Sequence, residues 1–348
     1  MRRALALAQN ALNTATPNPR VGCVLVRDGR VIGEGWTQPY GGPHAEQHAL
    51  LSCSEDPGGA TAYVTLEPCN HVGASGRKES CVESLLRARV GCVVVATLDP
   101  SPKMSGQSLE ALKNAGVDVA TGVCEEDARE MNLGFFSRIT RGRPWVRLKM
   151  AASLDGRTAL ANGESQWITG PAARADGHAW RARACAVMTG IGTVLQDDPQ
   201  LTVRDITTPR QPQRIVVDRH SQTPATAKIL RGQPVWIFTA RAADKKPNAE
   251  NIAMPDGNNR VDLNAMMQEL GRRRINELHV EAGARLSGAL LEHGLVDELL
   301  LYFAPCLLGD SARGMFTLPA LTDLSQRMSL QVRDWSPIGN DWRMIARL

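Results

Sequence analysis

Two stretches, Pro43-His44-Ala45-Glu46 and Glu67-Pro68-Cys69, decide the fold of the first half of this 348-residue chain, together with Cys81. Catalytic Zn²⁺ favours imidazole and thiolate ligands and takes three of them from the protein, which leaves the fourth position open for water. One histidine and two cysteines supply that set here. The sequence therefore predicts a zinc site whose ligands are His44, Cys69 and Cys81.

Glu46 is the acid–base group of the predicted site. It lies two residues beyond His44, so its carboxylate can reach a metal-bound water without ligating the ion. Zn²⁺ lowers the pKa of such a water, and a carboxylate can take its proton and deliver it to a leaving amine. His-x-Glu followed by Pro-Cys and a second Cys is the signature of zinc deaminases that act on nucleobases. We therefore expect Glu46 to be the catalytic residue of a deaminase domain.

The interval between the two cysteines departs from the tight Cys-x-x-Cys spacing that many deaminases have. Here Asn70–Ser80 separates them. His71 lies in this interval and is a rival ligand. It follows Cys69 too closely to bind the same ion comfortably, so we favour a substrate contact or a loop role for it. A helix that begins near Cys81 would favour the thiolate form of that cysteine.

Length and composition favour two domains, because domains usually contain about 100–200 residues. The longest apolar runs, such as Val90–Ala96 and Leu299–Ala304, are far shorter than the roughly 18 residues that cross a bilayer. Met1-Arg2-Arg3 followed by Ala4–Ala8 is similar to a signal peptide, but the apolar run ends at Gln9-Asn10 without a cleavage site. We expect an amphipathic helix there, in a cytoplasmic protein with no membrane partner.

Charge and aromatic content argue against a dedicated nucleic-acid binder. The net charge is +4 and only 4% of the residues are aromatic, whereas such a binder carries a dense basic stripe with aromatic side chains for base stacking. A modest positive charge suits a phosphorylated small molecule equally well. Five further cysteines are expected to be small buried hydrophobes rather than parts of a disulfide framework, namely Cys23, Cys92, Cys124, Cys185 and Cys306.

Predicted strands and helices alternate on both sides of Arg141-Gly142-Arg143-Pro144, which indicates two layered α/β domains, 1–143 and 144–348. In the first we expect strands at Val21–Val26, Val31-Ile32, Ala62–Leu66 and Cys92–Leu98, and helices at 2–13, His44–Leu51, Glu79–Arg89 and Leu109–Ala115. In the second we expect strands at Val146–Met150, Ala186–Thr189, Arg214–Asp218, Val235–Thr239 and Glu277–Glu281, with Leu299–Ala304 closing the series. Helices are expected there at Pro171–Arg183, Leu263–Arg273 and Ser287–His293.

Further motifs lie in both halves. The first half contains Thr16-Pro17-Asn18-Pro19-Arg20-Val21-Gly22 and Thr65-Leu66-Glu67-Pro68-Cys69-Asn70-His71. The second half contains Leu148–Arg157, Gly163–Thr169, Asp197–Arg204 and Val280–Gly283. In these motifs, in matching order and over nearly the whole chain, the sequence resembles the bifunctional deaminase–reductase family of riboflavin biosynthesis.

The resemblance implies two consecutive reactions. A cytidine deaminase-like three-layer domain would hydrolytically deaminate 2,5-diamino-6-(5-phosphoribosylamino)pyrimidin-4-one. A dihydrofolate reductase-like domain would then reduce the ribosyl side chain to ribityl with NADPH. The resemblance also implies self-association through the reductase domain, and the preference for NADPH over NADH rests on it alone.

The same resemblance implies cofactor contacts by Ala151, Trp167, Thr193, Asp197 and the segment Gly283-Ala284-Arg285-Leu286-Ser287-Gly288-Ala289. It implies substrate contacts by Asn18, Ser165, Arg181, Leu201, Arg204 and Glu281. Arg181 and Arg204 suit this role, because a guanidinium group binds phosphate at two points.

Sequence patterns in the second half support some of these roles, but each pattern also has another interpretation. Gly190-Ile191-Gly192 is only a partial dinucleotide-binding motif. Small residues in Glu281–Ala289, before a predicted helix, would let backbone N–H groups approach a phosphate, and a tight turn is the alternative. Arg219 is a candidate for the 2′-phosphate of NADPH, with a solvated loop arginine as the alternative.

The zinc loop departs from the family pattern Cys-x-His-x-Gly-Arg-Thr-Pro-Pro-Cys, because this chain has three more residues and lacks the paired prolines. A short insertion costs little closure entropy, so the ligands can still converge. Arg77 is the candidate for the family's arginine. Two alternatives remain open: a nucleic-acid base deaminase, and a chain with a silenced deaminase that retains only a reductase or structural role.

Overall fold

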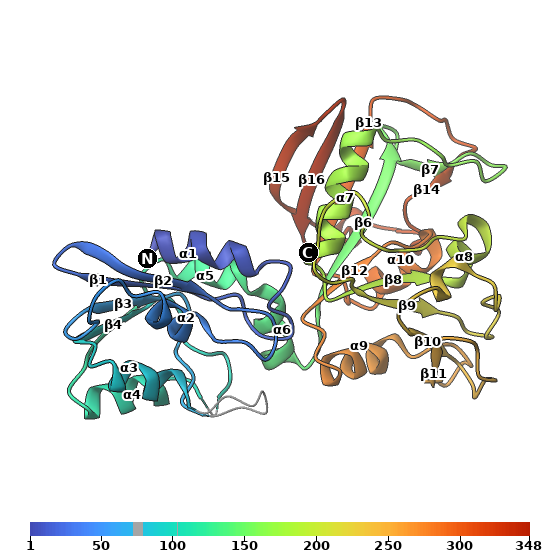
Figure 1. Ribbon diagram of the computed structural model, residues 1–348. Helices are drawn as coiled ribbons and strands as arrows, with labels where there is room; N and C mark the ends of the chain where they lie inside the picture. The colour runs from blue at the N-terminus through green and yellow to red at the C-terminus, as the bar shows by residue number, and fades with distance from the viewer. Residues whose placement is uncertain (72–78, 103) are drawn as a thin grey trace. The chain divides into compact units, whose positions relative to one another are not determined.

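The computed structural model describes residues 1–71, 79–102 and 104–348, which form two units, Met1–Gly142 and Arg143–Leu348 (Figure 1). The sequence-based boundary after residue 143 lies one residue from this division. Arg77, the candidate for the family's arginine, falls outside the described residues. No helix in the described part of the chain is long and apolar enough to cross a membrane.

A mixed five-stranded sheet forms the middle layer of the first unit, in the order β2-β1-β3-β4-β5. Its strands are β1 (Gly22–Arg27), β2 (Arg30–Trp36), β3 (Thr61–Val64), β4 (Cys92–Val95) and β5 (Asp118–Thr121). The pairs of β1 with β2 and with β3 are antiparallel, and β3, β4 and β5 run parallel.

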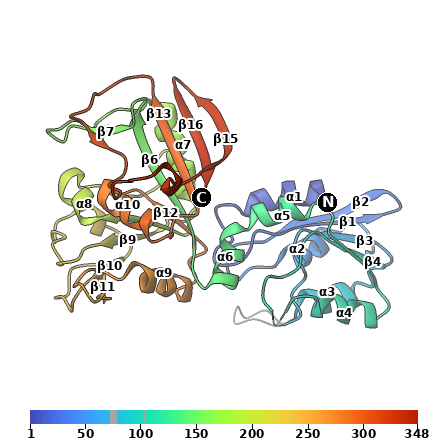
Figure 2. The ribbon, with the colours of Figure 1, turned by 180° about the vertical axis from the view of Figure 1, so that it is seen from behind.

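Helices cover both faces of this sheet. They are α1 (Arg2–Ala8), η1 (Gln9–Ala11), α2 (Ala45–Leu51), α3 (Cys81–Arg87), α4 (Gln107–Asn114), α5 (Glu125–Met131) and α6 (Leu133–Arg141). In both ribbon views α1 and α5 lie on one face, and α2, α3 and α4 lie on the other (Figures 1 and 2). The first unit is therefore a three-layer α/β/α domain.

Two glycines let helices approach the sheet closely from opposite sides. A Cβ at Gly22 would lie 1.8 Å from the carbonyl oxygen of Ala4 in α1, and a Cβ at Gly35 would lie 2.3 Å from the amide nitrogen of Ala49 in α2. Gly35 pairs with Cys23, the neighbour of Gly22, and neighbouring strand residues face opposite sides. Glycine at these positions thus fixes α2, and with it the residues at its N-terminus, directly on the sheet.

A nine-stranded sheet forms the centre of the second unit, in the order β11-β10-β9-β8-β12-β6-β13-β16-β15. The strands are β6 (Trp145–Ser153), β8 (Ala186–Gly190), β9 (Gln213–Val217), β10 (Val235–Thr239), β11 (Ala249–Ala253), β12 (Glu277–Val280), β13 (Glu298–Ala304), β15 (Gln331–Ile338) and β16 (Asp341–Arg347). All neighbours run parallel except at β16 and β15, which pair antiparallel. A two-stranded sheet joins β7 (Arg157–Ala159) and β14 (Arg313–Gly314).

The first helix of the second unit follows β7 along the chain, and the others follow parallel strands of the nine-stranded sheet. The helices are α7 (Pro171–Arg183), α8 (Ile191–Asp197), α9 (Leu263–Arg272) and α10 (Ala284–Glu292), with short 3₁₀ turns η2 (Lys228–Leu230) and η3 (Leu324–Gln326). The central strands are largely buried, as expected for parallel strands covered on both faces, and their buried residues include Arg147, Glu277 and His279 besides the apolar ones.

Several sequence-based expectations about elements were wrong. The strand at Leu299–Ala304 does not close the series, because the hairpin β15–β16 adds to β13. The helix expected from residue 287 already begins at Ala284, after Gly283 as N-cap. The helix expected from residue 79 begins only at Cys81, because Ser80 is its N-cap and accepts the Glu83 N–H at 3.1 Å.

Three of the five cysteines that were expected to be buried also depart from expectation. Cys306 is exposed, because β13 ends at Ala304 and the cysteine falls in the following loop. Cys92 and Cys124 are only partly buried, whereas Cys23 and Cys185 are buried as expected.

Candidate active sites

Three predicted zinc ligands converge in the first unit. The Nδ1 atom of His44 lies 3.6 Å from the Sγ atom of Cys69 and 3.4 Å from the Sγ atom of Cys81, and the three ligand atoms lie within 4.8 Å of one another. With Zn–N at about 2.0–2.1 Å and Zn–S at about 2.3 Å, ligand atoms of a tetrahedral site lie roughly 3.6 Å apart. The donor set and its spacing therefore fit a zinc ion.

The ligands come from two helix starts and one loop. His44 is the N-cap of α2 and Cys81 is the first residue of α3. Cys69 follows β3, and its carbonyl oxygen accepts the N–H of Val82 at 3.2 Å. This backbone bond ties the loop with the first cysteine to the helix with the second.

One buried carboxyl group interacts with the ligands. Glu46 lies in the first turn of α2 and is 3% exposed. Burial raises the pKa of Glu46, and the electrostatic interaction with His44 opposes this shift. A hydrogen bond between the two cysteines lowers the pKa of Cys69 and raises that of Cys81. A carboxyl group with a raised pKa beside a thiolate site is suited to accept and return a proton.

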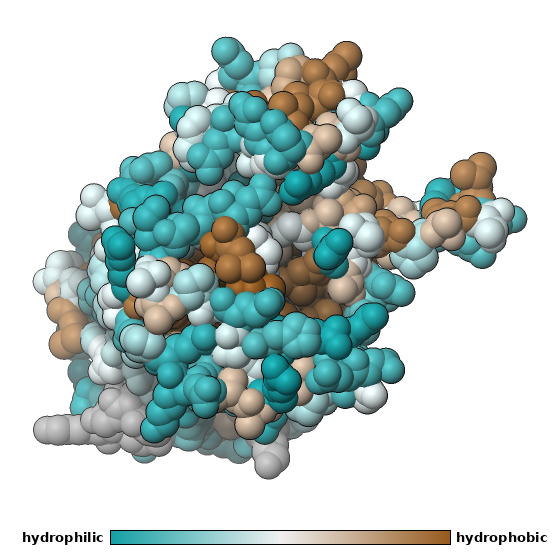
Figure 3. Space-filling model, turned by 90° about the vertical axis from the view of Figure 1, so that its right-hand side faces the viewer, coloured by the Kyte–Doolittle hydropathy of each residue, from teal (hydrophilic) through white to brown (hydrophobic). Residues whose placement is uncertain are grey.

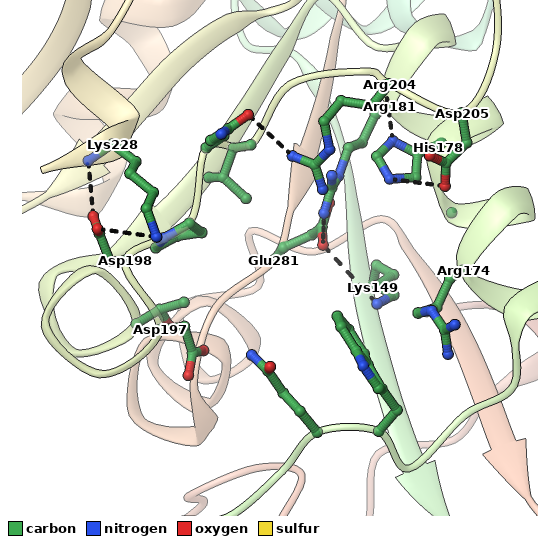
Figure 4. A pocket seen from close by; sticks show the side chains of 17 residues that line it. Lys149, Arg174, His178, Arg181, Asp197, Asp198, Arg204, Asp205, Lys228 and Glu281 are labelled. Atoms are coloured by element: carbon green, nitrogen blue, oxygen red, sulfur yellow. Dashed lines mark hydrogen bonds and ion pairs between the residues drawn. The ribbon is translucent and has the colours of Figure 1, made fainter.

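The second unit contains a cavity of about 560 Å³ at the ends of parallel strands (Figure 4). Seven residues that the sequence assigned to cofactor or substrate line it, namely Trp167, Arg181, Thr193, Asp197, Leu201, Arg204 and Glu281. Such crevices at the carboxyl ends of strands are where open α/β sheets bind ligands. In the space-filling view, hydrophobic side chains gather near the middle of one face, and hydrophilic side chains surround them (Figure 3).

Arg181 and Glu281 form the most buried ion pair of the cavity wall. The guanidinium group donates from Nε and from Nη2 to the two carboxylate oxygens, the second at 2.8 Å, and from Nη1 to the Thr202 carbonyl oxygen at 3.2 Å. Burial alone would raise the pKa of Glu281, but the charge of Arg181 and its hydrogen bonds hold it well below the usual range. The carboxylate therefore stays ionised.

Residues 1–97 match the family model for the cytidine and deoxycytidylate deaminase zinc-binding region, and residues 144–344 match that for the RibD C-terminal domain. The riboflavin biosynthesis protein RibD of Escherichia coli is 44% identical over 357 residues, which cover 98% of this chain and 96% of that protein. RibD of Haemophilus influenzae is 44% identical over 360 residues, covering 99% and 95%.

The chain belongs to the RibD family.

Solved structures agree with this assignment. Acinetobacter baumannii RibD, in its form 1, superposes with a TM-score of 0.92 at 42% identity, covering 99% of this chain and 97% of that one. A Thermotoga maritima protein, described as a diaminohydroxyphosphoribosylaminopyrimidine deaminase/5-amino-6-(5-phosphoribosylamino)uracil reductase, superposes with a TM-score of 0.90 at 34% identity, covering 100% and 97%. The predicted family and fold class are thus confirmed, and the RibD-type chain has a zinc-binding deaminase domain followed by a reductase domain.

Some site residues predicted for the RibD chain do not line the described cavity. They are Ala151, Ser165, Arg219 and the segment 283–289. Arg219 is exposed in the loop after β9. Ser287 is fully buried and donates to the Ala282 carbonyl oxygen at 3.2 Å, and a Cβ at Gly288 would lie 1.9 Å from the Thr317 carbonyl oxygen. Both positions therefore pack inside the domain, and the cofactor role of the segment stays a prediction.

Two predicted residues of the deaminase half lie outside the ligand group. His71 is exposed, and the group of potential ligands among the described residues does not include it. Asn18 lies in the turn after η1, where its N–H donates to the Ala15 carbonyl oxygen at 2.9 Å. A substrate role for either residue stays a prediction.

Sequence reasoning missed several residues at both sites. Glu67 accepts backbone N–H groups of Asp99, Gly106 and Ser108 at 3.0–3.2 Å, and so ties their loop to the segment before Cys69. The sequence signal for the role of Glu67 was its position before a proline, at the end of a buried strand. In the cavity, six further titratable side chains were missed, namely Lys149, Arg174, His178, Asp198, Asp205 and Lys228.

Lys149 lies within the Leu148–Arg157 motif, but nothing in the sequence indicated that it would line a cavity. Its Nζ atom lies 3.9 Å from Glu281 and 5.7 Å from the centre of the Tyr302 ring. Burial lowers the pKa of Lys149, and the charge of Glu281 opposes this. Figure 4 shows Lys149, Arg181 and Glu281 grouped in one part of the cavity.

Proposed function

We propose that this RibD-family chain carries out both steps implied by its sequence. The first unit hydrolytically deaminates 2,5-diamino-6-(5-phosphoribosylamino)pyrimidin-4-one, and the second reduces the ribosyl chain of the product with NADPH. The observation that carries the proposal is the convergence of His44, Cys69 and Cys81 beside the buried Glu46. The description of the Thermotoga maritima relative supports the substrate.

In the deaminase unit, this chain's residues hold the ion and move protons. Zinc held by the imidazole and the two thiolates supplies Lewis acidity toward a water molecule. Glu46 accepts a proton from the attacking water and delivers it to the leaving ammonia, which balances the hydrolysis. Its burial keeps bulk water away and makes the protonated form accessible, because burial raises its pKa.

In the reductase unit, the protein mainly positions two ligands. NADPH supplies the hydride when it is bound. Arg204 and Lys228 bring positive charge to the cavity for a phosphorylated substrate, and Lys149 with Glu281 offers a donor and an acceptor inside it. The Trp167 ring is 69% exposed at the cavity and packs against Arg174 at 4.6 Å, which makes it a flat surface for a cofactor ring.

Sequential turnover tests this proposal. The purified chain should contain about one zinc ion per polypeptide and release ammonia from the diaminopyrimidine without NADPH. When NADPH is added, the enzyme should consume one equivalent of NADPH for each ribityl product formed. Far less than one zinc ion per chain together with no ammonia release would favour the silenced-deaminase alternative. The close spacing of the His44, Cys69 and Cys81 ligand atoms, despite the longer loop between the cysteines, argues against that alternative.

We also propose that the chain self-associates through its reductase unit and works in the cytoplasm. The edge strand β15 is exposed, and an edge strand offers unpaired backbone groups. Exposed apolar side chains precede it, namely Leu318, Leu321, Leu324, Met328 and Leu330. A Leu324→Asp variant that remains oligomeric in light scattering would show that these exposed side chains do not form the interface.

The cysteines support the proposed location. All eight cysteines are free, which suits the reducing conditions of the cytoplasm.

A further inference from the structure

One side chain of α2 connects the chain segments that carry two of the zinc ligands. The amide oxygen of Gln47 accepts the N–H of His44 at 3.4 Å, and its amide nitrogen donates to the carbonyl oxygen of Glu79 at 3.3 Å. Gln47 does not belong to the ligand set itself. It thus joins the backbone of one ligand to the backbone two residues before Cys81.

Ser84 of α3 completes this connection. Its hydroxyl accepts from the Gln47 amide nitrogen at 3.2 Å and lies 2.8 Å from a carboxylate oxygen of Glu79 and 3.0 Å from the Ser80 carbonyl oxygen. Ser84 and Ser80 are buried, so their polar groups depend on these protein partners. Arg87 donates to the same carboxylate oxygen at 2.7 Å. The carboxylate of Glu79 is therefore held from two positions on α3.

The local sequence makes this connection important. Glu79 and Ser80 precede Cys81, and neither restricts its backbone as proline would. The long interval Asn70–Ser80 also leaves the chain more conformations to lose when the second cysteine is placed. Partners behind metal ligands commonly fix the orientation of those ligands.

We propose that Gln47, Ser84 and Glu79 are positioning residues that hold Cys81 beside His44 and so determine how firmly zinc is retained. They do not touch the reacting atoms. The inference rests on the proposed zinc-dependent function, but zinc retention can be measured separately from turnover.

The test measures zinc release from the full-length, zinc-loaded protein into excess chromogenic chelator. Gln47→Met keeps side-chain length and removes the three hydrogen bonds of the amide, and Ser84→Ala removes the hydroxyl. Gln107→Met is the matched control, because Gln107 is exposed on α4 of the same unit. We expect release to be roughly tenfold faster or more in the first two variants, and within about twofold of wild type in the control.

Conservative replacement and a spectroscopic signature separate positioning from general destabilisation. Glu79→Gln keeps an oxygen acceptor for Ser84 and should retain zinc nearly as wild type, whereas Glu79→Ala should not. In cobalt-substituted protein, thiolate-to-cobalt absorption should weaken in Gln47→Met and stay unchanged in Gln107→Met. Because the substituted residues all lie in the first unit, thermal unfolding followed by circular dichroism reports whether that unit is folded in each variant.

The outcomes are distinguishable. Zinc release from Gln47→Met and Ser84→Ala at the rate of the control, with unchanged cobalt spectra, would overturn the positioning role. If Gln47→Met does not fold, Ser84→Ala compared with Gln107→Met decides the question alone. A wild-type protein that binds neither zinc nor cobalt would instead contradict the proposed deaminase function.

Discussion

Arg181 on α7 and Glu281 after β12 are bound to each other by two hydrogen bonds, although a hundred residues of sequence separate them. Each was expected to contact substrate independently, Arg181 through a phosphate. The pairing means that much of the charge of Arg181 is already balanced inside the protein. A substrate phosphate would therefore depend more on Arg204, whose guanidinium group has only long contacts of 3.4–3.5 Å with other described residues.

Removing either member of this pair should destabilise the second unit. Arg181→Met leaves a buried carboxylate without its main partner, and Glu281→Gln leaves a buried cation, so each should cost about 3–5 kcal/mol. The double variant should lose less than the sum of the single variants, because the unpaired charge is gone. Urea unfolding of the three variants and the wild type measures this coupling. Strictly additive losses would mean that the two side chains do not stabilise each other.

The zinc site was predictable because its chemistry is local. Three ligand-type residues and one carboxylate lie in two short stretches and one further position, and their order matches a single reaction class. The deaminase fold agrees with this pattern, because two of the ligands lie at helix starts and the third lies in the loop after a strand. Sequence patterns say less about Glu67, whose three hydrogen bonds reach Asp99 in a distant loop and Gly106 and Ser108 at the start of α4.

The reductase site was less predictable, because its geometry depends on long-range pairing. Lys149 on a buried strand and His178 on a helix are ordinary in sequence, and only the fold brings them to one cavity. The hairpin β15–β16 was missed because Arg333, Asp334 and Pro337 break the alternation that indicates a strand. An edge strand tolerates such residues, since one of its sides needs no partner.

Glu46→Gln should separate the two activities of the chain. The amide keeps the shape of the side chain but cannot take a proton, so ammonia release should fall by at least about 100-fold. Zinc content should stay near wild type, because Glu46 is not a ligand. Reduction of the separately supplied deaminated intermediate should also be unchanged. Survival of deamination in Glu46→Gln would show that another group moves the proton.

Gly288→Ala should destabilise the reductase unit whether or not NADPH is present. A Cβ at this position would lie 1.9 Å from the backbone oxygen of Thr317, so the two segments must separate, at a cost of about 1–3 kcal/mol. Gly192→Ala is the control, because a Cβ there meets nothing within 4 Å. Thermal unfolding with and without NADPH measures both variants. A wild-type melting temperature for Gly288→Ala combined with a raised KM for NADPH would instead support the cofactor role expected from sequence.

His178 should make reductase activity sensitive to mild acid. Its Nδ1 atom accepts the backbone N–H of Arg204 at 3.3 Å, and its Nε2 atom lies 3.4 Å from Asp205. Burial lowers the pKa of His178 below 6.5, the charges of Arg181 and Arg204 lower it further, and Asp205 and Glu281 oppose the shift. The folded protein therefore holds the neutral ring that this backbone bond requires.

The sign of the effect follows from this shift. Below the unfolded pKa of about 6.5, the unfolded chain binds a proton that the folded chain resists, so stability falls as pH decreases toward the folded pKa. Protonation also takes the Nδ1 lone pair from the Arg204 N–H and frees the loop. The KM for the phosphorylated substrate should therefore rise more than kcat falls between about pH 7.5 and 5.5. His178→Asn keeps an acceptor oxygen that does not titrate, so its KM should vary less with pH; an unchanged profile would assign the acid sensitivity to another group.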